Sequence, residues 1–274
     1  MNKVPEAHTF LDFSDYARPF ARWLVRLLLP TPITPIHLTW TYTLVGLGAA
    51  VLFAINRWPL LAGLLLLLKS ALDAADGSLA RARQHPSRVG RFLDSVCDFL
   101  VMAAVFGGLA IQKWSQTGHV AYFGLALVAL LCATLQGSVF SYYYVRYRAE
   151  TGGDQTSHPN ESEPAGYAWD NPTALKILHT LYRWIYGWQD RLMARLDHWA
   201  APSNARLSPA FLTATTVLGL GSQLLVIALC AAIGQAGWAL WLFPTVFNLY
   251  WLFLIIIRHF SRPVRSDKQK ISSI

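Results

Sequence analysis

The chain has 274 residues, of which 54% are hydrophobic and only 14% charged, and its formal net charge is +8. Charged residues this scarce, beside long uninterrupted apolar runs, exclude an ordinary soluble domain and indicate a polytopic membrane protein. The basic residues flank the apolar segments, so we interpret the positive charge as a topology signal and not as a nucleic-acid-binding surface.

The first element expected is an amphipathic helix over Phe10–Leu29, within an N-terminal segment of residues 1–36. Its apolar face carries Phe13, Tyr16, Ala17, Phe20, Trp23, Leu24 and Leu27, and its other side carries Arg18, Arg22 and Arg26. A basic face opposite aromatic and leucine side chains is typical of a helix that lies on an anionic membrane surface. Packing of this helix against the rest of the chain is the alternative.

Six apolar segments follow, each long enough to cross about 30 Å of hydrocarbon as a helix rising about 1.5 Å per residue. They are His37–Ile55, Trp58–Leu79, Val89–Ile111, Val120–Tyr144, Phe211–Ile233 and Trp238–Ile257. The predicted fold is therefore all-α, with six transmembrane helices preceded by the interfacial helix. The first four helices occupy residues 37–150, and the last two occupy residues 208–260.

The basic residues predict the orientation of these spans. Of the 23 Lys and Arg residues, 21 lie in the N-terminal segment, in the segments Lys69–Arg91 and Arg146–Arg206, or from Arg258 onward. The other three connections contain Arg57, Lys113 and no basic residue. The positive-inside rule therefore places both termini, including a tail over 261–274, and the connection after the second span on the cytoplasmic side. We expect an integral, multi-pass membrane protein.

Residues 151–207 form a hydrophilic insertion after the fourth span. Gly152–Pro164 is polar and acidic and is expected to be a loop. Thr173–Trp199 carries leucines at helical spacing, and its tryptophans suit the headgroup zone, so an amphipathic helix is expected there. This helix lies on the membrane, covers the mouth of an active site or packs on its own chain, and the sequence leaves these alternatives open.

Four aspartates stand out at the second and third spans. Of the 15 Asp and Glu residues, only Asp73, Asp76, Asp94 and Asp98 fall within or at the edge of apolar spans. Ionisable groups at membrane depth are costly and usually functional. Residues three or four apart share one helix face, so each pair of aspartates faces one way. The connection around Pro86 allows the two helices to bring all four carboxylates to one point.

Four converging carboxylates repel one another unless a divalent cation neutralises them, and all-oxygen ligation suits Mg²⁺ or Mn²⁺. Gly77, Ala80 and Gly90 share these helix faces and leave room for a ligand to approach closely. Lys69, four residues before Asp73, either pairs with that aspartate or extends towards the membrane interface.

The segment from Asp73 to Asp98 resembles the signature of the CDP-alcohol phosphotransferase family, also called CDP-alcohol phosphatidyltransferases. That signature reads D-x-x-D-G-x-x-A-R, eight residues, then G-x-x-x-D-x-x-x-D. The matching positions are Asp73, Asp76, Gly77, Ala80, Arg81, Gly90, Asp94 and Asp98, and the spacer is Ala82–Val89. All eight fixed identities are present at the required spacing.

The resemblance implies a membrane transferase of phospholipid biosynthesis. A substituted phosphate group, most often the phosphatidyl group of CDP-diacylglycerol, passes to an alcohol acceptor and CMP leaves. The family pattern implies two Mg²⁺ or Mn²⁺ ions bound by Asp73, Asp76, Asp94 and Asp98, with Asp98 also acting as the catalytic acceptor of a proton. It implies a CDP-donor site formed by Asp73, Asp76, Gly77, Ala80, Arg81 and Gly90.

The end of the fourth span, S-Y-Y-Y-V-R-Y-R-A-E, resembles a segment of family members with sugar-phosphate or inositol-phosphate acceptors. The resemblance implies that Arg146 and Arg148 bind an acceptor phosphate, although topology alone also supplies arginines at this point. The expected partners are a CDP-diacylglycerol-type lipid donor, a small alcohol or polyol-phosphate acceptor and membrane lipids, without nucleic acid. A homodimer is compatible with this interpretation. An ion- or proton-coupled transporter that uses the intramembrane carboxylates is the alternative function.

Overall fold

The computed structural model describes residues 4–5, 8–153, 166–200 and 207–260, and every regular element in these ranges is a helix. The predicted all-α class is therefore confirmed for this part of the chain. Most of the expected loop over Gly152–Pro164 and the whole tail over 261–274 lie outside the described residues.

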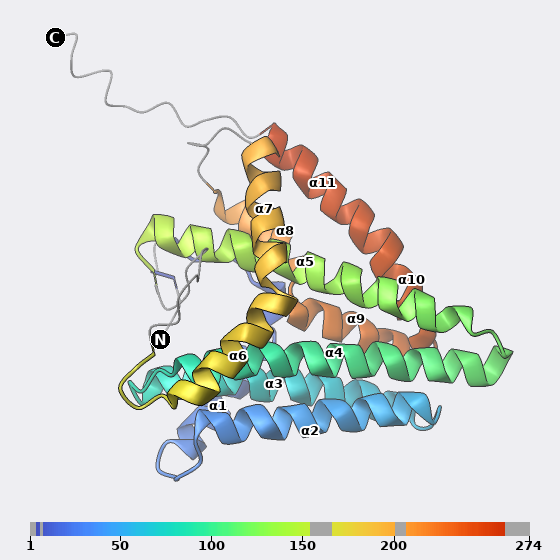
Figure 1. Ribbon diagram of the computed structural model, residues 1–274, viewed down its shortest axis with the longest axis horizontal. Helices are drawn as coiled ribbons and strands as arrows, with labels where there is room; N and C mark the ends of the chain where they lie inside the picture. Colours follow the sequence, from blue (N-terminus) through green and yellow to red (C-terminus); the bar gives the residue numbers. More distant parts are fainter. Residues whose placement is uncertain (1–3, 6–7, 154–165, 201–206, 261–274) are drawn as a thin grey trace, which may run out of the picture.

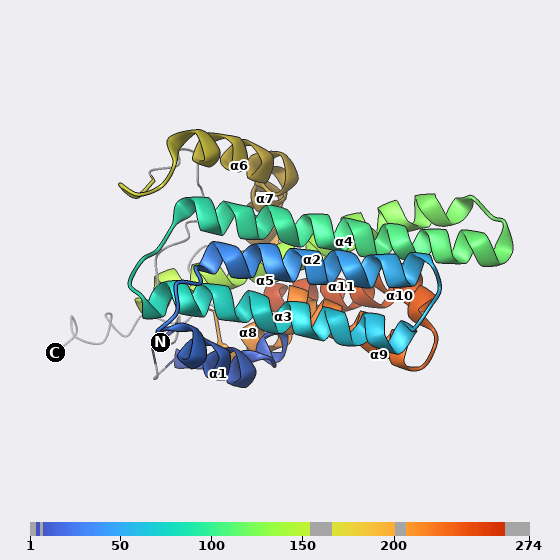
Figure 2. The same ribbon diagram turned by 90° about the horizontal axis from the view of Figure 1, so that it is seen from below.

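Three long helices lie side by side, namely α2 (Pro35–Ala54), α3 (Pro59–Ala82) and α4 (Arg88–Thr117) (Figures 1 and 2). Two of them begin with a capping hydroxyl, because the Thr34 and Ser87 side chains accept hydrogen bonds from backbone N–H groups three residues later. Helices α2 and α4 approach very closely at Gly108, where an added Cβ atom would lie 2.4 Å from the carbonyl oxygen of Ala50. This packing fixes α4 against α2, which in turn packs along α3.

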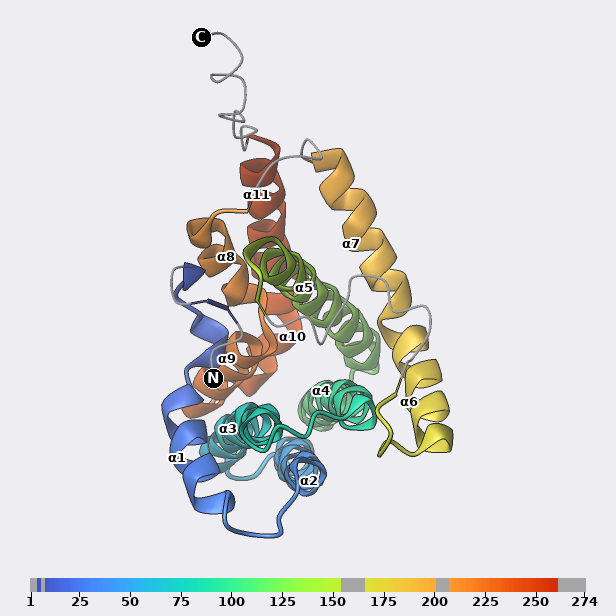
Figure 3. The same cartoon turned by 90° about the vertical axis from the view of Figure 1, so that its left-hand side faces the viewer.

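Helix α5 (Ala121–Thr151) runs back along α4 after a turn at Gly118, which has a positive φ of 74°. Its C-terminal part diverges from α4, as Figures 1 and 3 show. Helix α1 (Arg18–Leu28) packs on α3 on the opposite side of the three-helix layer (Figure 3). The divergence of α4 and α5 leaves the space in which the candidate site is found.

The C-terminal third contains α8 (Pro209–Thr215), α9 (Leu220–Ala232), α10 (Ala239–Leu242) and α11 (Asn248–His259). A 3-10 turn over Thr216–Leu218 joins α8 to α9, and the two parts are bent by 47°. The N-terminal 3-10 turn over Phe13–Asp15 sits on this bend. The backbone N–H of Phe13 donates to Thr216 Oγ1 over 3.1 Å, and a Cβ atom on Gly221 would lie 1.9 Å from the Ser14 carbonyl oxygen.

Several of these helices are apolar enough to cross a membrane. Among the described residues, four qualify by length and composition, namely Pro35–Ala54, Arg88–Thr117, Ala121–Thr151 and Ala236–His259, and the bent pair Pro209–Leu218 and Leu220–Ala232 makes a fifth. The expected second span does form helix α3, but its lysine and aspartates keep it outside this set. The set of six spans is therefore not confirmed, although the apolar helices indicate a membrane protein.

The N-terminal amphipathic helix differs from its prediction. A short 3-10 turn precedes α1 instead of one continuous helix over Phe10–Leu29. The small residues Ala21 and Val25 are buried, whereas Phe20, Trp23 and Leu27 of the predicted apolar face are exposed. One side of α1 therefore packs on the rest of the chain. Contact of its exposed aromatic side with the membrane interface stays a prediction.

The amphipathic helix expected over Thr173–Trp199 divides into α6 (Pro172–Ile185) and α7 (Gly187–Ala200). The break falls at Tyr186, whose hydroxyl donates to the Ser95 carbonyl oxygen over 3.2 Å. Trp184 and Trp199 are among the most exposed side chains of these two helices. The insertion therefore packs on α4 through one side and leaves large aromatic residues exposed on another.

Candidate active site

A cavity of about 1380 Å³ lies among α1, α3, α4, α5 and the start of α9. All eight residues of the aspartate signature line it: Asp73, Asp76, Gly77, Ala80, Arg81, Gly90, Asp94 and Asp98. The fold thus brings both halves of the signature to one cavity, as the helix-face argument required.

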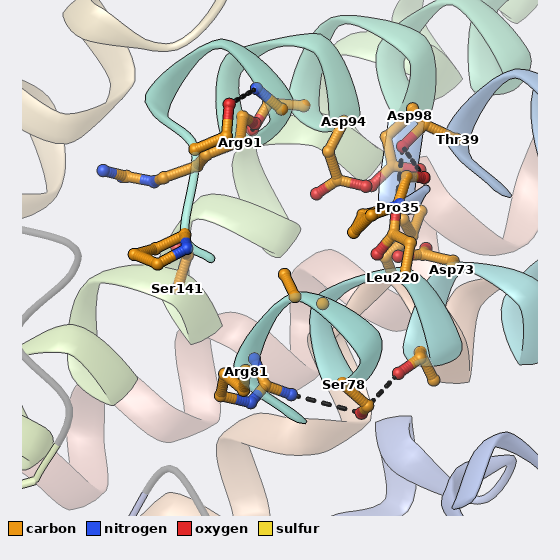
Figure 4. Close-up of a pocket in the computed structure, with 18 of the residues that line it drawn as sticks. Pro35, Thr39, Asp73, Ser78, Arg81, Arg91, Asp94, Asp98, Ser141 and Leu220 are labelled. Atoms are coloured by element: carbon orange, nitrogen blue, oxygen red, sulfur yellow. Dashed lines mark hydrogen bonds between the residues drawn. The ribbon is translucent and has the colours of Figure 1, made fainter. Parts of the chain in front are cut away.

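Three of the four carboxylates form a tight group. Asp73 and Asp76 on α3 and Asp94 on α4 each offer one oxygen, and these oxygens lie within 4.8 Å of one another. Figure 4 shows Asp73 and Asp94 approaching each other from the two helices. The i, i+3 spacing on α3 and the close packing of α3, α2 and α4 together produce this arrangement.

Two hydroxyl groups from α2 hold this carboxylate group in place. Thr39 Oγ1 donates to Asp76 Oδ2 over 2.8 Å, and the Tyr42 hydroxyl donates to Asp94 Oδ1 over 2.6 Å. Neither residue was predicted from the sequence. Their spacing of three places them on one helix face, but the same helix also carries His37, Thr41 and Thr43, so polarity alone does not single them out.

The donor set fits a divalent cation. Asp76 is only 6% exposed, and its hydrogen-bond partner is a neutral hydroxyl. A buried carboxylate beside two others is costly unless positive charge reaches it, and carboxylate oxygens are the ligands that Mg²⁺ and Mn²⁺ prefer. Asp73, Asp76 and Asp94 could therefore hold such an ion.

Asp98 has a different environment from the other three aspartates. It lines the cavity and forms an ion pair with Lys69, which also donates to Asp73 Oδ2 over 2.6 Å. Of the two alternatives for Lys69, pairing with Asp73 is confirmed, because its side chain is 1% exposed and turned inward. In the described residues, the group of three close carboxylates does not include Asp98.

Small and basic residues complete the wall near the carboxylates. An added Cβ atom at Gly90 would meet only Ser87, at 3.5 Å, so the glycine opens onto free space. Arg81 Nη2 donates to Ser78 Oγ over 3.2 Å, and Figure 4 shows Arg81 and Arg91 apart from the aspartates. The cavity thus contains basic side chains at a distance from the group of three carboxylates, which suits a phosphorylated ligand bound with a metal ion.

The two arginines expected at the acceptor site lie in different surroundings. Arg148 lines the cavity, is 4% exposed and lies with its guanidinium 4.9 Å from the centre of the Tyr144 ring. Arg146 instead pairs with Glu150 and with Asp197 on α7, and it is absent from the cavity wall formed by the described residues. The structure therefore brings only Arg148 to the site.

Residues just before α6 hold the turn between α3 and α4, and we call this contact the clasp. Ser87 Oγ donates to Asp170 Oδ1 over 2.6 Å, the Arg88 backbone N–H donates to Asp170 Oδ2 over 2.9 Å, and the Trp169 indole donates to the Pro86 carbonyl over 2.8 Å. The pKa of Asp170 is lowered overall. Burial alone would raise this pKa, but the hydrogen bonds from the Ser87 hydroxyl and from nearby backbone N–H groups stabilise the carboxylate by more. No sequence pattern predicted this contact.

Comparison with known proteins gives a family match. A family model described as CDP-alcohol phosphatidyltransferase matches residues 28–185. Phosphatidylinositol phosphate synthase of Mycobacterium marinum is 35% identical over 158 residues, which are 56% of this chain and 61% of the relative. Archaetidylinositol phosphate synthase of Pyrococcus horikoshii is 37% identical over 124 residues, which are 45% of this chain and 59% of the relative.

These alignments leave part of each relative unmatched, since the chain spans half to about three fifths of the length of several of them. Among solved structures, the crystal structure of Mycobacterium tuberculosis phosphatidylinositol phosphate synthase with CDP-DAG bound is 25% identical. The match covers 66% of this chain and 92% of that chain, with a TM-score of 0.35.

Proposed function

The chain belongs to the CDP-alcohol phosphatidyltransferase family, and from that premise we propose that it transfers a phosphatidyl group from CDP-diacylglycerol to a phosphorylated polyol, releasing CMP. The observation that carries this proposal is the group of three carboxylates, with oxygens within 4.8 Å of one another, in a cavity lined by the whole aspartate signature.

Asp73, Asp76 and Asp94 would hold Mg²⁺ or Mn²⁺. When bound, the ion supplies positive charge that neutralises a diphosphate and the charge that develops on the leaving CMP. The chain contributes the orientation of these ligands, because Thr39 and Tyr42 fix the carboxylates of Asp76 and Asp94. This fixed geometry is supplied before the substrate binds, which reduces the cost of reorganisation.

The donor would lie against the small residues of the signature. Gly77 and Gly90 leave room for the nucleotide beside α3 and α4, and Ala80 extends this surface by one turn. Arg81 lines the same cavity and is suited to a phosphate oxygen of the donor. These assignments rest on the family pattern together with the positions of the side chains.

In the proposed reaction, an acceptor hydroxyl oxygen attacks the donor phosphorus. A new phosphorus–oxygen bond forms, the bond to the CMP oxygen breaks, and the hydroxyl proton passes to a carboxylate oxygen of Asp98. The contribution of Asp98 comes mainly from its position beside the reacting hydroxyl. Lys69 supports this role by holding the Asp98 carboxylate at the cavity wall.

For the acceptor we propose a phosphorylated polyol such as inositol phosphate. Two observations favour this class: the buried Arg148 faces the cavity, and the named relatives synthesise phosphoinositol lipids. A guanidinium group suits a phosphate monoester because it offers planar, paired N–H donors. Arg146 is a weaker candidate because Asp197 and Glu150 already engage it.

We place the protein in a membrane through six spans, with both termini and the cavity on the cytoplasmic side. The distribution of Lys and Arg supports this topology, and the apolar helices support the membrane location. The exposed aromatic residues of α1 and the exposed tryptophans Trp184 and Trp199 would then contact the membrane surface.

A transporter would be favoured by a broken helix beside the carboxylates, and the bend between α8 and α9 is such a break. The N-terminal turn fills this bend, because the Phe13 backbone N–H donates a hydrogen bond to the Thr216 hydroxyl and the Ser14 backbone packs directly on Gly221. The bend therefore has a packing explanation that requires no ion pathway, and we do not advance transport as a second function.

The test is a transfer assay with the detergent-solubilised full chain and CDP-diacylglycerol. We expect transfer to inositol phosphate or glycerol 3-phosphate to exceed transfer to serine or free inositol. Stripping metal with a chelator should abolish activity, and Mg²⁺ or Mn²⁺ should restore it. Undiminished turnover in excess EDTA, or no transfer to any alcohol, would contradict the proposal.

A further inference from the structure

Lys69 is a buried cation that belongs to neither half of the aspartate signature. It lies on α3 one turn before Asp73, its side chain is 1% exposed, and its apolar stem crosses the protein interior. Its ammonium group lies 2.6 Å from Asp73 Oδ2, pairs with Asp98 on α4 and sits 4.5 Å from the centre of the Tyr42 ring. The ammonium thus occupies the space between one carboxylate from each half of the signature.

A buried ammonium group is costly unless carboxylates pair with it, and here two do so. The same contacts give Asp73 and Asp98 a positively charged partner. Asp76 instead accepts a hydrogen bond from the neutral hydroxyl of Thr39, and it joins Asp73 and Asp94 in the group of three close carboxylates. The signature therefore divides into a side that already contains a cation and a side that needs one.

A second metal ion between Asp73 and Asp98 would have to share their oxygens with the Lys69 ammonium. Two cations competing for the same carboxylates repel one another strongly at low dielectric. With Lys69 present, one divalent ion leaves the four carboxylates with one net negative charge, and two ions leave one net positive charge. The competition for the Asp73 and Asp98 oxygens that Lys69 already engages, and not the net charge, therefore disfavours a second ion.

We propose that the Lys69 ammonium takes the place of a second metal ion, so that the chain without donor binds one divalent cation, at Asp73, Asp76 and Asp94. This inference rests on the proposed function, which supplies the metal site, but it departs from the two ions that the family resemblance implies. Lys69 acts as a positioning residue that holds Asp73 and Asp98 at a fixed separation.

The test counts bound Mn²⁺ in the detergent-solubilised full chain without donor, by equilibrium dialysis with electron paramagnetic resonance of the free ion. The variants are Lys69→Met, which keeps the apolar stem, and Lys69→Arg, which keeps the charge. Lys113→Met is the matched control, because Lys113 lies on α4 away from the cavity and donates only to Gln116 in its described hydrogen bonds.

We expect one tightly bound Mn²⁺ per chain in the wild type, in Lys69→Arg and in Lys113→Met, and two in Lys69→Met. Mn²⁺ should also raise the melting temperature of Lys69→Met more than that of the wild type, because its carboxylates lack the internal cation. Two ions in the wild type, or one in a folded Lys69→Met, would overturn the inference. If Lys69→Met does not fold, the wild-type stoichiometry alone decides between one ion and two.

The transfer assay distinguishes the failure of this inference from the failure of the proposed function. A wild-type chain that transfers phosphatidyl groups and binds two Mn²⁺ ions keeps the function and loses the role of Lys69. A wild-type chain that binds no Mn²⁺ loses the inference, and its transfer activity then decides separately whether the proposed function stands.

Discussion

The molecule contains two buried clusters of charged side chains that differ in their balance of acidic and basic groups. The motif cluster contains the four aspartates of the signature and Lys69, and its aspartates line the cavity. In the Asp197 cluster, the Asp197 carboxylate on α7 pairs with Arg146 and Arg258 and accepts a hydrogen bond from Tyr143 over 3.1 Å, and Arg146 also pairs with Glu150. The first cluster has excess negative charge, whereas the two acids and two arginines of the second balance one another.

This difference distinguishes the candidate site in the motif cluster from the structural contact in the Asp197 cluster. The Asp197 carboxylate is 4% exposed and engaged by two guanidinium groups, so it has little capacity left for a ligand. It joins α5, α7 and α11 away from the cavity. The motif cluster keeps carboxylate oxygens that only an external cation can neutralise. A surplus of one charge beside open space, more than burial itself, therefore distinguishes the cluster that we propose to bind the metal ion.

The largest effect on this comparison should come from Asp98→Asn. The variant removes the proposed proton acceptor but leaves the three close carboxylates, so we expect turnover to fall about 10²–10⁴-fold while CDP binding persists. Steady-state kinetics and a CDP-binding measurement check both parts. More than about a tenth of wild-type kcat would show that Asp98 does not have this role.

Asp197→Asn should produce the opposite pattern. It leaves Arg146 and Arg258 without their shared carboxylate in a buried position, and breaking such a network typically costs about 3–5 kcal/mol. We expect a clear loss of thermal stability in detergent, with turnover per folded molecule close to that of the wild type at low temperature. A large fall in kcat without a loss of stability would place this cluster in the site.

The two neighbouring arginines sharpen the comparison, because Arg146 belongs to the Asp197 cluster whereas Arg148 lines the cavity. Losing a charge-assisted contact of about 1.5–3 kcal/mol in Arg148→Gln should raise the KM for a phosphorylated acceptor roughly 10- to 150-fold. The donor KM should change little. Arg146→Gln is the matched control, and we expect it to lower stability with little change in either KM. Equal effects on phosphorylated and unphosphorylated acceptors would remove Arg148 from the acceptor site.

The smallest effect should come from the clasp at Asp170. Asp170→Asn weakens charge-assisted hydrogen bonds to Ser87 and to backbone N–H groups, and we expect a loss of about 1–3 kcal/mol in the free energy of unfolding. Thermal unfolding of the wild type and the variant measures this difference directly.

The pH dependence of the clasp follows from the lowered pKa of Asp170. A carboxylate with a lower pKa in the folded state stabilises the fold above its unfolded value of about 3.8, and this contribution is lost as the pH falls through the folded pKa. The difference between wild type and Asp170→Asn should therefore be constant from pH 8 to pH 5 and shrink below about pH 4. A difference that already disappears near pH 6 would contradict this assignment.

The sequence predicted those features that depend on local spacing. The convergence of the signature follows from residues three and four apart on helices, and the helical class follows from the apolar runs. Thr39 and Tyr42 were missed because their carboxylate partners lie 37 and 52 residues away in the chain. Arg146 was assigned to the acceptor from the resemblance of its segment, and its pairing with Asp197, 51 residues away, has no local pattern that could have predicted it.

Two further differences have tertiary causes as well. The single helix expected over Thr173–Trp199 breaks at Tyr186, where the tyrosine hydroxyl reaches the backbone of α4. The apolar face assigned to α1 is divided between a narrow buried stripe at Ala21 and Val25 and an exposed aromatic side. Periodicity identifies an amphipathic segment, but it does not tell which neighbour the segment will meet.

The clasp has a consequence for the order in which the molecule is assembled during translation. Ser87 and Asp170 are 83 residues apart, so the ribosome completes α3, α4 and α5 before the residue that secures the α3–α4 turn has been made. A nascent chain ending after α5 already contains every residue of the signature, yet its turn still lacks the Asp170 and Trp169 contacts. The turn between the two aspartate-bearing helices therefore acquires its final restraint late, when the residues that precede α6 emerge and dock.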